Sequence, residues 1–205
     1  MALFDAIEAG NAAEVRSLLA ADPALASARS DTGVSALLWA RYRNHAEVVE
    51  ALLAADPELD VFDASALGHL PRLAELVEAD PAVANAWSAD GFTPLGLAAF
   101  FGHPAAVGFL LDHGADFHSV ARNPMRVQPH HAATAARSVE SVRLLLEAGA
   151  DPDAEQQEGW TALMVARRHG DTEIVDLLLA HGAHERPAPD EDQPAQDRAN
   201  DSTTS

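Results

Sequence analysis

The sequence has 205 residues, of which 48% are hydrophobic and 22% are charged, enough for one domain or two small ones with a sizeable core. Its 13 basic residues are all arginine and stand against 32 acidic residues, which gives a formal net charge of −19. DNA or an anionic membrane surface would be repelled, so we expect neither a nucleic-acid nor a membrane partner. Because the sequence contains no cysteine, disulfides, thiolate nucleophiles and cysteine-ligated metal sites are excluded.

The start of the sequence and its composition indicate where the protein works. Residues 1–6 lack the basic region and apolar run of a secretory signal, and no later stretch approaches the roughly 18 apolar residues of a membrane span. We therefore expect a cytoplasmic protein. The exclusive use of arginine and the abundance of alanine favour a bacterial source with GC-rich coding sequences.

Six helical segments in chain order each end in a pair of apolar residues. The pairs are Leu18-Leu19, Leu52-Leu53, Leu76-Val77, Leu110-Leu111, Leu145-Leu146 and Leu178-Leu179. Their successive spacings are 34, 24, 34, 35 and 33 residues. The sequence is therefore an array of units of about 33–35 residues in which one unit is about ten residues short.

A second, alanine-rich helix precedes each of these segments, and a chain-reversing residue marks its end. These residues are Gly10, Asn44, Gly68, Gly102, Arg137 and Gly170. Five of the six are residue types that tolerate a positive φ. Gly-Ala or Asp-Pro follows the second helix and stops it. Each unit is thus predicted to be two short antiparallel helices.

The segments between units contain a recurrent Gly-x-Thr-Pro-Leu pattern, most complete at Gly91-Phe92-Thr93-Pro94-Leu95. Residues 90–116 as a whole resemble a near-consensus ankyrin repeat, and the resemblance extends over about residues 1–184. It implies an all-α ankyrin-repeat solenoid of stacked helix-turn-helix units with short β-hairpin loops. The implied units are approximately 1–29, 30–58, 59–87, 88–120, 121–154 and 155–184.

The first two units and the next two are copies of one another. A shift of 58 residues places Phe4-Asp5-Ala6 on Phe62-Asp63-Ala64, Gly33 on Gly91 and His45 on His103 without a gap. Unit three copies a unit that opens the chain and lacks a preceding hairpin, which explains its short spacing. We expect an interrupted row of hairpins and a change of curvature between units two and four; simple deletion of a loop would predict the same missing hairpin.

Two further segments depart from the repeat. Residues 185–205 are acidic and rich in proline, with too few apolar residues to offset the entropy of ordering, and are predicted to be a disordered tail. The hairpin of unit five, residues 121–129, carries Arg126 where other units have glycine, and Arg137 ends its first helix. We expect irregular geometry in that unit.

The resemblance also implies which positions face a partner: the residue after the hairpin glycine, and the two residues before the terminal glycine of the first helix. We predict a partner-binding groove formed by Val34, Tyr42, Arg43, Phe92, Phe100, Phe101, Arg126, Val127, Trp160, Arg168 and His169. Aromatic and arginine side chains are enriched where binding energy concentrates. One alternative for Phe100 and Phe101 is that they fill the space left by the missing third hairpin.

The function predicted from these features is a non-enzymatic module that binds a protein partner as a monomer and uses no cofactor. One alternative is a metal-binding or hydrolytic protein that uses His130 and His131, with His103, His113 and His118 nearby in sequence. Within the family, however, His131 corresponds to a structural histidine that forms hydrogen bonds. The second alternative is an acidic polyanion mimic, since residues 1–121 contain 17 acidic residues and five arginines.

Overall fold

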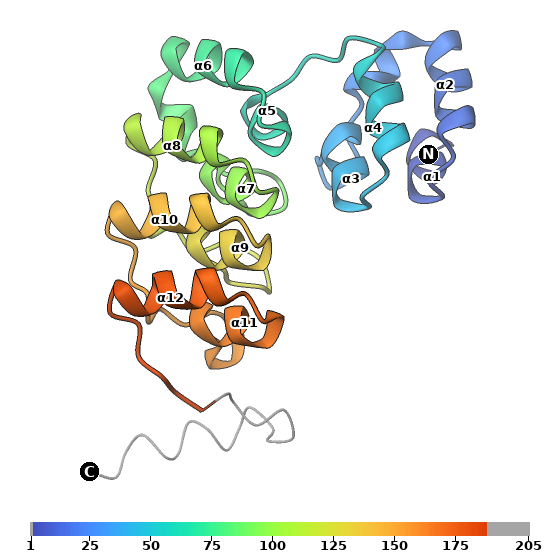
Figure 1. The fold of residues 1–205 in the computed structure, drawn as a ribbon. Helices are drawn as coiled ribbons and strands as arrows, with labels where there is room; N and C mark the ends of the chain where they lie inside the picture. Colours follow the sequence, from blue (N-terminus) through green and yellow to red (C-terminus); the bar gives the residue numbers. More distant parts are fainter. Residues whose placement is uncertain (1, 188–205) are drawn as a thin grey trace.

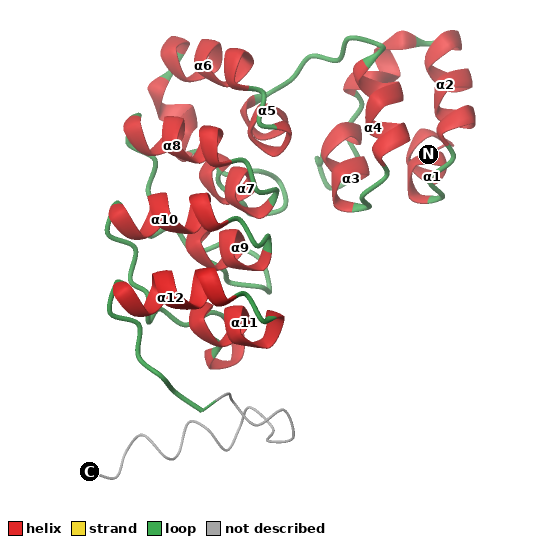
Figure 2. Ribbon diagram, viewed as in Figure 1, coloured by secondary structure: helices red, strands yellow, loops and turns green. Residues whose placement is uncertain are grey.

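The computed structural model describes residues 2–187, which form helices and loops but no named strand (Figure 2). The helices are α1 (Ala2–Glu8), α2 (Ala12–Ala21), α3 (Ala36–Tyr42), α4 (Ala46–Leu53), α5 (Val61–Leu67), α6 (Leu70–Ala79), α7 (Pro94–Phe100), α8 (Pro104–Asp112), α9 (Pro129–Ala135), α10 (Val139–Glu147), α11 (Ala162–His169) and α12 (Thr172–Ala180). They form six consecutive antiparallel pairs, which we call repeats one to six (Figure 1). The fold is the all-α ankyrin solenoid that the sequence predicts.

The residues at the ends of the helices are of types that favour starting or stopping a helix. The hydroxyl of Thr93 accepts a hydrogen bond from Gly96 N–H at the start of α7, and Pro94 occupies the first turn, where its missing N–H costs nothing. The six residues predicted to reverse the chain after the first helix of each repeat all have positive φ, between 55° and 72°. Arg137 is among them, so the expectation of irregular geometry at this helix end is wrong.

The helices pack in two layers. In repeats three to six the first helices α5, α7, α9 and α11 lie side by side, and the second helices α6, α8, α10 and α12 form the other layer (Figure 1). Small buried residues such as Ala98 and Ala133 let neighbouring helices approach closely. Helices of seven to ten residues are too short to be stable alone in water, so each repeat depends on its neighbours.

The solenoid is interrupted between repeats two and three. One hydrophobic cluster extends from Leu3 to Leu52 and a second one from Val61 to Ala183. A smaller third cluster bridges them and contains Leu38 of α3 and Ala66 of α5. Helix α4 does not pack alongside α6, and an extended segment connects α4 to α5 (Figure 1). No hairpin precedes α5 in the described chain. The predicted interruption and change of direction are thus confirmed.

We call the tight loop before the first helix of a repeat its finger, and finger four takes the place of the missing third one. The Tyr42 hydroxyl donates a 2.5 Å hydrogen bond to Asp90 in finger four. At Gly33 in finger two, an added Cβ would lie 3.1 Å from Ala89 Cβ. Fingers two and four, which are 58 residues apart in the duplicated sequence, are therefore direct neighbours.

A polar connection joins repeats two and three where the hydrophobic clusters divide. The hydroxyl of Ser35 donates a 2.5 Å hydrogen bond to the buried carboxylate of Asp63, and Arg29 forms a 2.6 Å ion pair with Asp60. Burial, followed by the nearby Asp60 charge, raises the pKa of Asp63 to about 6. This junction is held by hydrogen bonds and charges as well as by apolar contact.

Finger five differs from the others in length. Ala121 N–H bonds to Val127 O, a separation of six residues, whereas Ser88 N–H bonds to Phe92 O in finger four. Arg126 adopts a φ of 49° at the position of the hairpin glycine. The irregularity predicted for this hairpin is therefore a longer loop with a non-glycine residue in the left-handed region.

We expect Arg126→Gly to raise the free energy of unfolding by about 0.5–1 kcal/mol, because glycine adopts a positive φ without the steric cost that arginine has. Urea denaturation measures the change. The matched control is Arg137→Gly, which relieves a similar φ of 57° but removes the ion pair between Arg137 and Asp171. A loss of stability in Arg126→Gly equal to that of the control would contradict the strain at residue 126.

The last described residues pack against repeat six. Glu185 pairs with Arg167, and Arg186 Nη1 lies 2.9 Å from Glu155 Oε1. Residues 185–187 of the predicted tail are thus in contact with repeat six or directly follow such residues, and the rest of it, residues 188–205, lies outside the described residues. No helix in the described part is long and apolar enough to cross a membrane.

Candidate protein-interaction surface

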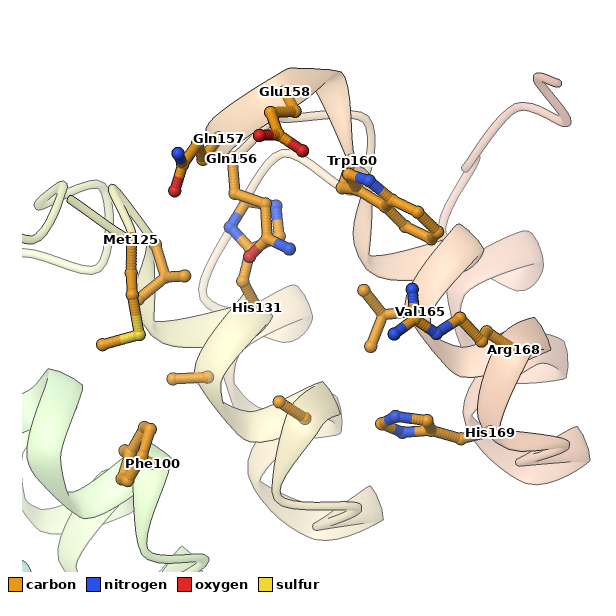
Figure 3. A pocket seen from close by; sticks show the side chains of 13 residues that line it. Phe100, Met125, His131, Gln156, Gln157, Glu158, Trp160, Val165, Arg168 and His169 are labelled. Atoms are coloured by element: carbon orange, nitrogen blue, oxygen red, sulfur yellow. The ribbon is translucent and has the colours of Figure 1, made fainter. Parts of the chain in front are cut away.

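A groove of about 380 Å³ lies between the fingers and the first helices of repeats four to six. Figure 3 shows its two sides: Met125 and residues 156–158 come from fingers five and six, whereas Phe100, Val165, Arg168 and His169 come from the helices. We call it the repeat 4–6 groove.

Two small side chains form part of the groove floor. Repeat four contributes Phe100 at one end and repeat six contributes Trp160 at the other, whereas α9 contributes His131 and two alanines, Ala132 and Ala135. Alanine cannot fill the space between two large aromatic rings. The result is a hollow with an apolar floor and an aromatic side chain at each end.

One end of the groove carries basic groups. The Arg168 guanidinium lies 5.1 Å from the centre of the Trp160 ring, within the range of a cation–π interaction. His169 follows on the same helix, and Glu158 on finger six is the single acidic residue in the lining. The stacked pair places an aromatic ring and a cation at this end of the groove.

Five of the predicted partner-binding residues come together in this groove. They are Phe100, Val127, Trp160, Arg168 and His169. They belong to three repeats and are up to 69 positions apart in the sequence. The stacking of repeats brings them together.

The prediction is wrong for two finger residues. Val34 is 6% exposed and Phe92 is 3% exposed, and both belong to a buried cluster that also contains Leu38 and Leu97. Because finger three is missing, fingers two and four close on each other and bury these side chains. Neither residue is available to a partner.

Tyr42, Phe100 and Phe101 form an aromatic cluster that accounts for the missing finger. The Tyr42 ring lies 5.5 Å from Phe101 and 6.0 Å from Phe100, and the Arg41 guanidinium lies 4.6 Å from the Phe101 ring. This arrangement supports the alternative that aromatic residues fill the vacated space. Phe100 serves both purposes, since it also lines the repeat 4–6 groove.

Two predicted arginines lie outside the groove lining. Arg43 pairs with Glu8 at 2.8 Å and lies over the Trp39 ring, which places it in repeats one and two. Arg126 is exposed on finger five, between Met125 and Val127, which do line the groove.

The histidines do not assemble into a metal site within the described residues. His131 Nδ1 accepts a hydrogen bond from Gln128 N–H at 3.2 Å, so its protonated Nε2 donates to Ala154 O at 2.8 Å. Burial lowers the pKa of His131 to about 4. The first bond lies at the start of α9, and the second links α9 to the loop between α10 and α11 that leads into repeat six. This is the structural role implied for this position by the ankyrin resemblance.

His130 occupies a position that is leucine in other repeats. It corresponds to Leu95 and Leu163, is fully buried, and neither ring nitrogen has a hydrogen-bond partner. Burial, together with the neighbouring His131 and His118, holds its pKa well below the usual value. His130 is thus enclosed in the repeat and does not line the groove.

The sequence reasoning missed several groove residues, among them Met125, Gln156, Gln157 and Val165. The prediction takes from each finger the residue after the hairpin glycine, and from finger five also Arg126 at the glycine position. The residues before that glycine form the fingertip, so the same repeat alignment contained the signal for Gln157 and Glu158.

Comparison with known proteins agrees with this architecture. A family model for ankyrin repeats in three copies matches residues 61–156 and 130–199, and a single-repeat model matches residues 32–61. The mouse protein "Ankyrin repeat and SAM domain-containing protein 6" is 31% identical over 160 residues, covering 74% of this chain and 14% of its own length.

Two further relatives have different overall descriptions. The Arabidopsis thaliana "E3 ubiquitin-protein ligase KEG" is 32% identical over 178 residues, covering 85% of this chain and 9% of that protein. The human "Mitochondrial disaggregase" is 45% identical over 51 residues, covering 25% of this chain and 7% of that protein. This chain thus corresponds to a small part of each relative. Together with the family matches over most of its length, the helical pairs and their stacking show that the chain belongs to the ankyrin-repeat family.

Proposed function

We propose that the protein is a non-enzymatic protein-interaction module whose repeat 4–6 groove binds a segment of a protein partner. Ankyrin repeats generally mediate protein–protein interactions, and the family is typically non-enzymatic. The observation that supports this groove is its aromatic residues, Phe100 and Trp160, on either side of an alanine floor. Large rigid aromatic side chains and arginine commonly dominate binding energy at interfaces.

The groove favours a partner segment that carries apolar side chains. These side chains would lie on Ala132 and Ala135, between Phe100 and Trp160. A stable complex needs about 800 Å² buried on each side, so the contact would extend from the groove onto the neighbouring fingers. We further propose that the module acts as a cytoplasmic monomer.

We expect the double variant Trp160→Ala/Arg168→Ala to weaken binding of a groove ligand at least tenfold, because it removes the aromatic side chain and the cation together. The ligand is obtained by selecting peptides from a displayed random library on the immobilised chain. Affinities are then measured by calorimetry.

Trp87 and Arg122 supply a matched control. The Arg122 guanidinium lies 3.9 Å from the Trp87 ring, so Trp87→Ala/Arg122→Ala removes the same two residue types away from the groove. Unchanged affinity in this control is expected. Equal loss in both variants, or selected peptides that bind the Trp160 variant normally, would overturn the groove assignment.

The polyanion-mimic alternative has less support. Several acidic residues of repeats one to three are engaged within the molecule, among them Glu8 with Arg43, Asp60 with Arg29 and Asp63 with Ser35. Hydrogen bonds from Trp39 and Arg43 hold the pKa of Glu8 below its usual value. These carboxylates contribute to the fold.

A further inference from the structure

A second hollow, of about 510 Å³, lies at the repeat-one end of the solenoid, between α1 and finger two. We call it the repeat-one hollow. Its apolar lining residues are only partly buried against the first hydrophobic cluster, and they include Phe4, Leu18, Leu25, Ala28 and Trp39. In the described chain no other helix packs on the outer side of α1 and α2 (Figure 1). This apolar surface is therefore accessible.

Repeat three contains a copy of this surface, and there it is filled. A shift of 58 residues places Phe4 and Asp5 on Phe62 and Asp63. Finger two packs against the copy, and only about 80 Å³ of space remains between finger two, Phe62 and Asp63. The repeat-one hollow is therefore the open counterpart of a contact that exists elsewhere in the same chain.

The filled copy shows which ligand chemistry the surface accepts. Finger two is a tight hairpin turn whose two sides are joined by the bridge between Arg29 and Ser35. The Ser35 hydroxyl donates a hydrogen bond to Asp63, and the Arg29 guanidinium pairs with Asp60. Val34, between them, is buried in the small cluster that joins the two halves. The occupant is thus a hairpin that combines an apolar side chain with a neighbouring cation and hydroxyl.

The open hollow carries a carboxylate on each side. Asp5 on α1 and Asp31 on finger two both line it, and both are exposed. Within residues 2–187 neither carboxylate forms a hydrogen bond or an ion pair. The one cation in the lining, Arg29, is paired with Asp60 on the far side of finger two. Because Asp60 aligns with Ala2, a cation in the hollow would meet its carboxylates at other positions than in the copy.

We propose that the repeat-one hollow binds a hairpin loop of a partner protein that presents an apolar side chain beside a lysine or an arginine. The apolar side chain would lie against Leu18 and Leu25, and the cation would pair with Asp5 or Asp31. Residues 1–121 contain 17 acidic residues and five arginines, so their field attracts a basic loop. A second copy of the chain is a poor occupant, because its net charge of −19 opposes the approach.

A displayed library of disulfide-closed hairpins tests the proposal. The hairpins have the frame of residues 28–36, since a 2.9 Å hydrogen bond from Ala36 N–H to Ala28 O closes the base of finger two. The bait is the full chain with Trp160→Ala/Arg168→Ala, so that ligands of the repeat 4–6 groove are not enriched. We expect the tightest hairpin to carry a lysine or an arginine. Asp5→Asn/Asp31→Asn should weaken its binding, measured by calorimetry, at least tenfold, because both carboxylates are removed.

Two further variants separate binding in the hollow from general attraction to an acidic surface. Glu47→Gln/Glu50→Gln changes net charge equally at exposed positions on α4 and should leave the affinity within twofold. Ala2→Trp adds an aromatic ring at the exposed edge of the hollow without changing charge, and should weaken binding at least tenfold. Equal loss in the two charge variants, unchanged affinity in Ala2→Trp, or a library that yields no ligand would overturn the proposal.

The remaining tryptophans report where the hairpin binds. Without Trp160, the bait retains Trp39, which lines the hollow, and Trp87, which does not. We expect the bound hairpin to shift the indole N–H resonance of Trp39 and to leave that of Trp87 unchanged. An unshifted Trp39 resonance would place the ligand elsewhere and contradict the proposal. Because the bait lacks two groove residues, failure of this experiment leaves the function proposed above untouched.

Discussion

Replacement of His130 by leucine is expected to raise the free energy of unfolding by about 1–3 kcal/mol at neutral pH. The imidazole is fully buried and neither nitrogen forms a hydrogen bond, and an unsatisfied buried polar group costs about that much. Leucine is already present and buried at the equivalent positions 95 and 163, so the site accepts its shape.

The stabilisation produced by His130→Leu should increase as the pH becomes acidic. The pKa of folded His130 is lowered by burial, so the wild-type fold is penalised once the unfolded imidazole becomes protonated below about pH 6.5. The stability of the wild type should therefore fall relative to His130→Leu as the pH decreases from 6.5. Urea denaturation between pH 5 and pH 8 measures both effects.

The adjacent histidine, His131, supplies the control, because its replacement should change stability in the opposite direction. His131→Leu removes the bonds to Gln128 N–H and Ala154 O and should lower the free energy of unfolding by about 1–3 kcal/mol. Destabilisation by both substitutions would show that His130 has a polar partner. Stabilisation by both would show that the inter-repeat bonds of His131 contribute nothing.

Asp63→Asn is expected to stabilise the protein by up to about 3 kcal/mol at pH 7.5. Burial raises the pKa of Asp63 to about 6, roughly two units above the usual value, and each unit corresponds to about 1.4 kcal/mol. Asparagine retains an oxygen that can accept the hydrogen bond from Ser35. It therefore keeps the connection between repeats two and three without the buried charge.

The pH dependence of the free energy of unfolding shows whether the charge on Asp63 destabilises the fold. Because the folded carboxyl retains its proton up to a higher pH than the unfolded one, wild-type stability falls relative to Asp63→Asn between about pH 4 and pH 6. The difference should be small at pH 4 and complete above pH 7.

Internal duplication supplies the control, since Asp5 aligns with Asp63 but is exposed on α1. Asp5→Asn should change the free energy of unfolding at pH 7.5 by less than about 0.5 kcal/mol, as is usual for an exposed position. A loss of stability on Asp63→Asn at pH 7.5 would show instead that the ionised carboxylate stabilises the junction through Arg29.

The fold can be predicted well from the sequence because residues of the same type recur at the same positions of each repeat. Gly10, Gly68 and Gly170 end helices where the spacing places them, and the missing third finger follows from the alignment of Phe62 with Phe4. The longer finger five, with Arg126 at the glycine position, also begins as a sequence irregularity.

The surface could be predicted only in part, because exposure depends on neighbours that are distant in the sequence. Val34 and Phe92 occupy positions that face outward in a regular array, yet finger four closes on finger two and buries them. The groove depends on the contrast between Phe100, Trp160 and the alanines of α9. The alignment lists these residues, but only the stacked structure shows that they form one hollow.

A crystal structure of the chain bound to its tightest library-selected peptide tests the groove most directly. We expect the peptide to lie between Phe100 and Trp160, over Ala132 and Ala135. A peptide bound to the outer helices, or to the surface of repeats one and two, with the groove empty would contradict the account.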